Sequence, residues 1–342
     1  MIKLCFAILT FSFLPGRSLY GQQYPRLPVL TAQQQKIYPT DWLIRTVKEK
    51  AGIYSSADLK EIILFNGLIK RSFRLRPNVA CIDFTNLGNG QQLLRAVKPE
   101  AMVTINGKEY NVGGLKGQKE NAYLQTDWLD DFSTDENDFK LERYEIKPLE
   151  AFVNWKASGW AMNKNLPTGK MISFTYGIAA PGLERIGVTV NYEIYDGLPL
   201  IVKWISIENK SNTTIKINRV VNELLALVEE ESAVVGTPGE MKKQHGIYVE
   251  TNYAFNNAMR YDISDQTTHW KTDSLYTSQV NYNYQTPCLL EIYPEKLVSV
   301  ELSPGQVFRS VRTHELLMDS YDRERRGLAI RKMYRVVAPW TT

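Results

Sequence analysis

Cysteine and histidine are scarce in this sequence. The 342 residues include three cysteines and three histidines. Cys81 and Cys288, which lie beyond the N-terminal region, are far apart in the chain, so they indicate two buried thiols rather than a disulfide framework. The histidines have no zinc-type spacing, and no H-E-x-x-H motif occurs. The sequence therefore predicts no bound metal and no cofactor.

Motifs for nucleotide binding and for serine hydrolase chemistry are also missing. The sequence contains no P-loop, no G-x-G-x-x-G turn after a strand and no G-x-S-x-G elbow. Charge of one sign is not in excess, because 41 basic residues face 37 acidic ones and leave a formal net charge of +4. A nucleic-acid-binding protein would carry a concentrated basic field. We therefore expect the chain to bind neither nucleotides nor nucleic acid.

The apolar run at the N-terminus is too short to span a bilayer. It covers Leu4–Leu14, follows Lys3 and precedes Pro15-Gly16. A charged, then an apolar, then a small-residue region is typical of a secretory signal peptide. Leu19 departs from the small residue that a cleavage site prefers. We expect residues 1–21 to be a signal peptide and the protein to be exported, either to the periplasm or as a secreted protein.

The rest of the sequence is rich in strand signals. Aromatic residues make up 11% of the chain, with 19 tyrosines and 7 tryptophans, and such residues favour strands. Apolar-rich runs flank Asn66-Gly67, Asn106-Gly107 and Asp196-Gly197, which are dipeptides that favour tight hairpin turns. Further short strands are expected at Val79–Thr85, Ile215–Leu227, Gly246–Glu250, Cys288–Tyr293, Leu297–Leu302 and Phe308–Thr313.

These signals predict an all-β fold, a large antiparallel sandwich over residues 60–313. Residues 22–59 are expected to be a linker that includes a short helix within Thr40–Leu59. The mixed-charge segment Glu315–Val337 is expected to be a C-terminal linking helix. The strand-like Val336-Val337 at its end is interpreted as the start of a further domain that this sequence does not include.

Four stretches together resemble a known family: Asn66–Ile69, Arg76–Ala80, Tyr192–Pro199 with Lys203-Trp204, and His314–Trp340. They resemble the N-terminal supersandwich domain of α-galactosidase-like glycoside hydrolases, family 36 and its relatives. In that family a linking helix and a (β/α)8 barrel follow, and the barrel carries the two catalytic aspartates. The resemblance implies that Met318–Val337 is the linking helix, that residues 336–342 begin the first barrel strand, and that this chain holds no catalytic residue.

The stretch Asn252–Gln285 is the best candidate for a ligand site in the sequence. It combines aromatic residues, which stack on the apolar faces of sugars, with amides and carboxylates, which bind sugar hydroxyls. The alternative is a pair of tyrosine-rich strands whose aromatic residues alternate between core and surface. The predicted carbohydrate-binding residues are Trp128, Tyr253, Trp270, Asp273 and Tyr276.

Two functional hypotheses follow. The first is a non-catalytic N-terminal portion of an exported α-galactosidase-like glycoside hydrolase. Such a portion would support a barrel that is missing or separately encoded, form one wall of the sugar site and provide contacts for a homo-oligomer. The second is a free-standing carbohydrate-binding module. A hydrolase with its own site inside the sandwich is a third reading, for which the sequence offers no motif.

Overall fold

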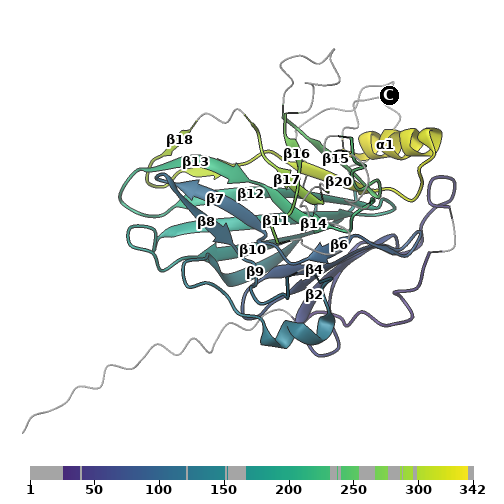
Figure 1. Cartoon of the computed structure of the whole chain (residues 1–342), viewed down its shortest axis with the longest axis horizontal. Helices are drawn as coiled ribbons and strands as arrows, with labels where there is room; N and C mark the ends of the chain where they lie inside the picture. Colours follow the sequence, from purple (N-terminus) through teal and green to yellow (C-terminus); the bar gives the residue numbers. More distant parts are fainter. Residues whose placement is uncertain are drawn as a thin grey trace, which may run out of the picture.

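Figure 1 shows the computed structural model, in which strands dominate. The described residues form four antiparallel sheets, one 3-10 helix, η1 (Thr126–Asp131), and one α-helix, α1 (Arg323–Val337). The all-β fold with a C-terminal helix is therefore confirmed. The structure describes residues 26–38, 41–120, 122–150, 152, 167–231, 237, 240–253, 266–275, 286, 288–295 and 299–337.

Three of the sheets are built from strands that lie within residues 52–112 and 215–302. The N-terminal sheet contains, in spatial order, β1 (Gly52–Ser55), β2 (Glu61–Phe65), β3 (Ile69–Arg74), β4 (Ala80–Asn86) and β5 (Gln91–Gln92). A four-stranded sheet contains β18 (Val300–Leu302), β13 (Ile215–Val221), β7 (Ala101–Ile105) and β8 (Lys108–Val112). Another contains β16 (Thr268–Lys271), β17 (Leu289–Ile292), β14 (Glu223–Leu227) and β6 (Leu94–Ala96).

The fourth sheet has seven strands and is called the large sheet below. Its main path runs through β15 (Ile247–Thr251), β20 (Thr313–Leu317), β12 (Leu200–Asn209), β11 (Ile186–Tyr195), β10 (Gly169–Gly177) and β9 (Lys140–Pro148). The remaining strand, β19 (Val307–Arg309), also pairs with β12. Strand β12 therefore pairs with β11, which precedes it in the chain, and with β19 and β20, which come about a hundred residues later.

The three predicted hairpins are present. Strands β2 and β3, β7 and β8, and β11 and β12 pair as antiparallel neighbours. At the β7–β8 turn both Asn106 (φ 51°) and Gly107 (φ 80°) adopt positive φ angles. Tight hairpin turns of this kind require positive φ at both central residues, which is why Asn-Gly is favoured there.

The two predicted helix positions need correction. Within Thr40–Leu59, the described residues form a turn and then strand β1, because Gly52–Ser55 pairs with β2. The C-terminal helix begins at Arg323, not near Glu315, since Thr313–Leu317 pairs with both β12 and β15. Val336 and Val337 are the last residues of α1 and not a strand. The sandwich thus extends to Leu317, while residues 338–342 lie outside the described part.

The large sheet has one buried face and one face that is only partly covered. On β11, Val188, Val190, Tyr192 and Ile194 are fully buried in the main core, which all four sheets share. Side chains alternate between the two faces of a strand. Thr189, Asn191 and Glu193 therefore belong to the opposite face, called the outer face below.

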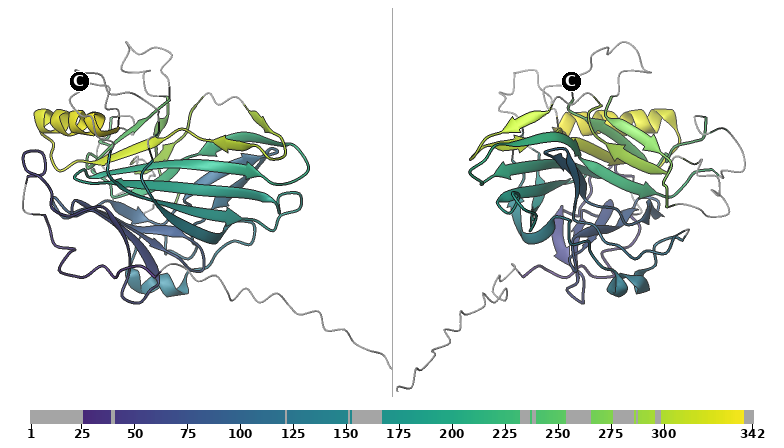
Figure 2. Two further views of the ribbon diagram at one scale, coloured as in Figure 1. Left: turned by 180° about the vertical axis from the view of Figure 1, so that it is seen from behind. Right: turned by 60° about the vertical axis from the view of Figure 1, so that its left-hand side comes forward.

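Helix α1 covers one end of the outer face. Asp322 accepts a hydrogen bond from the backbone N–H of Arg325 at 2.7 Å and so caps the helix start. Ala329 and Met333 pack with Leu200, Val202 and Leu316 in a second hydrophobic cluster. In all views of Figures 1 and 2, α1 lies at the top of the molecule and η1 at the bottom. Among the described residues, no helix is long and apolar enough to cross a membrane.

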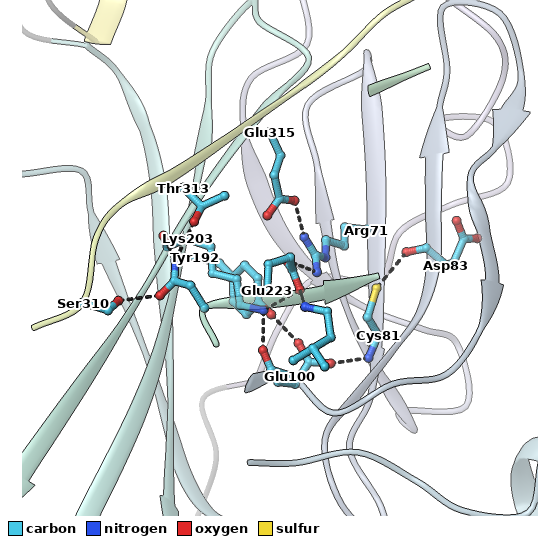
Figure 3. Close-up of polar contacts among 12 residues, drawn as sticks. Arg71, Cys81, Asp83, Glu100, Tyr192, Lys203, Glu223, Ser310, Thr313 and Glu315 are labelled. Carbon is cyan, nitrogen blue, oxygen red and sulfur yellow. Dashed lines mark hydrogen bonds and ion pairs between the residues drawn. The ribbon is translucent and has the colours of Figure 1, made fainter. Parts of the chain in front are cut away.

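A network of charged side chains lies inside the main core (Figure 3). The Arg71 guanidinium on β3 donates hydrogen bonds to Glu223 at 2.9 Å and to Glu315 at 2.7 Å. The Lys203 ammonium on β12 binds the second oxygen of Glu223 at 2.7 Å. All four side chains are at most 1% exposed. The network joins the N-terminal sheet, the β14 sheet and the large sheet.

Of the two carboxyl groups that Arg71 contacts, Glu315 is the one that keeps its proton, and burial also raises the pKa of Glu100. Two cations face three carboxyl groups, and the third, Glu100, accepts hydrogen bonds from the Tyr192 hydroxyl and the Cys81 amide. Burial opposes the ionisation of Glu223, but Arg71 and Lys203 outweigh it and lower the pKa of Glu223 to about 2. Burial and the neighbouring Glu223 raise the pKa of Glu315 well above its ordinary value. Glu315 is therefore the neutral partner.

We predict that Glu223→Gln destabilises the fold strongly. The substitution keeps the shape of the side chain but leaves Arg71 and Lys203 buried with less negative charge, which costs about 3–5 kcal/mol in comparable cases. Urea unfolding measures the loss. The matched control is Lys242→Ala, which removes an exposed pair with Glu231 and is expected to cost less than about 1 kcal/mol. Similar losses for both variants would contradict a stabilising role for the network.

A second prediction concerns pH. Because the pKa of Glu315 is raised in the folded state, its contribution to stability is present below the ordinary pKa of 4.5 and is lost as pH rises toward the folded pKa. Glu315→Gln mimics the protonated acid at every pH. We therefore expect the free energy of unfolding of the native chain, relative to that of this variant, to fall between pH 4 and pH 8. A relative stability that rises over this range would show that Glu315 is ionised.

Candidate functional site

In the described part of the chain, polar side chains gather around Arg71 and in a groove on the large sheet, and of these two places the groove is the one open to solvent. The charged network around Arg71 is enclosed by the core, with Arg71, Lys203 and Glu315 at 0% exposure. The other place is a groove of about 520 Å³ on the outer face of the large sheet, beside the end that α1 covers. A ligand can reach the groove without any rearrangement of the core. The groove is therefore the candidate site.

Two rows of side chains cross the floor of the groove because neighbouring strands hold them in register. The first, called the hydroxyl row, runs from β9 through β10, β11 and β12 to β19 and contains Arg143, Thr175, Thr189, Ser206 and Arg309. The second, called the amide row, contains Glu145, Ser173, Asn191 and Trp204.

Hydrogen bonds order the centre of these rows. The Ser173 hydroxyl donates to the side-chain oxygen of Asn191 at 2.7 Å. The hydroxyls of Thr175 and Thr189 are 3.3 Å apart. Each hydroxyl can both donate and accept a hydrogen bond. The rows therefore present fixed polar groups that suit either kind of partner.

One end of the amide row has an aromatic and cationic floor. The guanidinium carbon of Arg312 lies 3.9 Å from the ring centroid of Trp204 and 4.7 Å from that of Phe152. Arg312 also forms an ion pair with Glu193, which accepts a hydrogen bond from the Tyr195 hydroxyl at 2.7 Å. Burial and the Glu193 carboxylate raise the pKa of Tyr195, so its hydroxyl stays a donor. Arg312 is thereby held against Trp204.

The charges that line the groove balance. Its cationic side chains are Arg143, Lys147, Arg309 and Arg312, and its acidic side chains are Glu145, Glu150, Glu193 and Glu208. A cleft lined by one sign of charge would attract an ion of the opposite sign. Equal numbers of both signs, with hydroxyl and amide groups between them, favour a neutral polar ligand.

Basic side chains form ion pairs with three carboxylates of the groove. Glu193 pairs with Arg312, and Glu208 lies 2.9 Å from the Lys210 ammonium. A hydrogen bond from Lys147 lowers the pKa of Glu145.

Two of the residues predicted from the sequence, Trp128 and Trp270, lie outside the groove lining. Trp128 belongs to η1, packs against the cluster of Leu129 and Phe132, and has the Lys119 ammonium 4.6 Å from its ring centroid. Trp270 on β16 packs against the main core. The structure therefore assigns these two tryptophans to separate hydrophobic clusters.

The other predicted residues lie between β15 and β17. Asp273 is 1% exposed and forms an ion pair with Lys98 at 2.8 Å, which gives this carboxylate a structural role. Tyr253 follows β15, and Tyr276 lies outside the described residues, as does most of Asn252–Gln285. A sugar site in this stretch stays a prediction. Among the described residues, no group of three or more histidine, cysteine, aspartate or glutamate side chains could hold a metal ion.

Sequence reasoning missed the groove, although one signal was present. On β11, Thr189, Asn191 and Glu193 alternate with buried apolar residues, and on β12 Trp204 and Ser206 follow the same period. This pattern predicts a sheet with one polar face. The pairing of Asn191 with Trp204, which brings amide and indole together, depends on the register between the strands.

Comparisons with known proteins give likenesses in structure. No protein-family model and no curated protein matches the chain. Among solved structures, the family 36 α-galactosidase AgaB from Geobacillus stearothermophilus is similar over 79% of this chain and 41% of its own, with 12% identity and a TM-score of 0.44. An α-galactosidase from Lactobacillus brevis is similar over 85% of this chain and 42% of its own, with 10% identity and a TM-score of 0.43.

A family 97 glycoside hydrolase from Pseudoalteromonas sp. strain K8 is also similar, with 10% identity and a TM-score of 0.38 over 79% of this chain and 36% of its own. The chain thus spans about two fifths of the length of these solved structures. They include α-galactosidases of family 36, the family that the sequence resembles.

Proposed function

We propose that this chain is a non-catalytic, carbohydrate-binding β-sandwich whose binding surface is the groove on the outer face of the large sheet. In the form we favour, it is the N-terminal part of an exported α-galactosidase-like glycoside hydrolase and provides one wall of the sugar site. The observation that carries the proposal is the floor of the groove. There, Trp204 and the guanidinium of Arg312 lie beside hydroxyl and amide groups, and the lining has as many acidic as basic side chains.

The chemistry of this floor matches that of a sugar. A pyranose has apolar C–H faces, which pack on an aromatic ring, and a rim of hydroxyls, which bind donors and acceptors. Polar-ligand sites combine an apolar surface with a few placed polar groups. Trp204 is half-buried and supplies the surface, while Asn191 and Ser206 supply polar groups on the same face.

A site for an anionic ligand would look different. It would carry unpaired arginines or lysines that converge on one point. Here the most buried cation of the groove, Arg312, already has Glu193 as its ion-pair partner. This pairing supports a neutral ligand.

A free-standing carbohydrate-binding module is the second candidate, because residues of this chain line the groove. The two candidates differ in the role of a barrel domain. A free module keeps the same affinity for a sugar when such a domain is added separately. One wall of a shared site gains affinity on that addition.

We predict that the chain binds neutral oligosaccharides and that Trp204→Ala weakens binding by about tenfold or more, since central tryptophans commonly dominate a binding site. Calorimetric titration with melibiose, raffinose, stachyose, maltotriose and cellotriose measures the affinities. Trp204→Phe keeps an aromatic ring and is expected to lose less than Trp204→Ala. Melting temperatures close to that of the native chain confirm that the variants fold.

Trp128→Ala and Trp270→Phe are the matched controls, because both residues lie outside the groove. Unchanged affinity in these two variants supports the groove. Loss of binding in Trp270→Phe, with Trp204→Ala unaffected, would move the site to the Asn252–Gln285 stretch. If none of the five sugars binds, the proposed carbohydrate function is wrong.

A further inference from the structure

We infer that the groove binds a linear oligosaccharide that lies across the strands of the large sheet, and not a single sugar ring. This inference rests on the proposed function and adds the size and the direction of the ligand. It is carried by the hydroxyl row, Arg143 to Arg309, in which five consecutive strands each place one polar side chain at the same level.

The length of the row exceeds what a single sugar ring needs. Neighbouring strands of a sheet lie about 4.8 Å apart, so four spacings place Arg143 and Arg309 on strands about 19 Å apart. Both residues line the same groove. A monosaccharide reaches only a part of such a row, whereas a chain of sugars can contact all of it.

The chemistry along the row is repetitive. Thr175, Thr189 and Ser206 offer three hydroxyls in succession, and an arginine closes each end. Arg309 is exposed on β19 and is free to point donors at a ligand. Equivalent groups at a regular spacing suit a ligand that repeats the same hydroxyls along its length.

The aromatic floor lies toward one end of the row. Trp204 and Ser206 are two residues apart on β12, so both belong to the outer face, and β12 pairs with the strand that carries Arg309. Arg143 lies at the opposite end, on β9. A short ligand that packs on Trp204 therefore reaches Arg309 first. Only a longer ligand extends as far as Arg143.

The test is an affinity ladder. The native chain is titrated with galactose, melibiose, raffinose and stachyose, and with glucose, maltose, maltotriose and maltotetraose. We expect affinity to rise with chain length within the series that binds. Equal affinity for the disaccharide and the tetrasaccharide would overturn this inference and leave the proposed function standing. Absence of binding in both series would overturn both.

Two variants then fix the direction of the ligand. Arg143→Ala is expected to weaken binding of the tetrasaccharide about three- to tenfold, which corresponds to the loss of one hydrogen bond, and to leave the disaccharide unchanged. Arg309→Ala is expected to weaken both. Lys140→Ala, on the same strand as Arg143 but outside the groove lining, is the control. A length-dependent affinity that Arg143→Ala does not alter would show that the ligand runs in another direction.

Discussion

The interaction on which the structure depends is the bridge from Arg71 to Glu223 and Glu315. These three residues come from β3, β14 and β20, so a single guanidinium connects three of the four sheets (Figure 3). Lys203 extends the bridge to β12. An unpaired charge in such a core would be very costly, so the network favours an arrangement of the sheets in which each of these charges has a partner.

Fixing the inner face of the large sheet also determines its outer face. Lys203 and Glu315 point into the core. Trp204 follows Lys203 directly and Arg312 lies three residues before Glu315, so both belong to the outer face, as do Val202 and Leu316. Helix α1 covers the apolar end of that face and leaves the polar end open as a groove. The buried charges and the open groove are thus two consequences of one strand register.

The sequence predicted what is local and missed what depends on distant partners. The Asn106-Gly107 hairpin follows from backbone sterics alone, and it was predicted at the right place. Thr313–Leu317 contains helix-favouring Glu and Leu residues, yet pairing with two strands and the contact of Glu315 with Arg71 make it a strand. The groove was missed for a similar reason, because the sequence does not show that Asn191 lies opposite Trp204.

The central claim is that the outer face of the large sheet binds carbohydrate. A crystal structure of the chain grown with stachyose tests it most directly. We expect an ordered sugar that packs on Trp204 and has hydroxyls within hydrogen-bonding distance of Ser206 and Arg309, which line the groove. An ordered sugar bound beside Trp270, with the groove empty, would contradict the account.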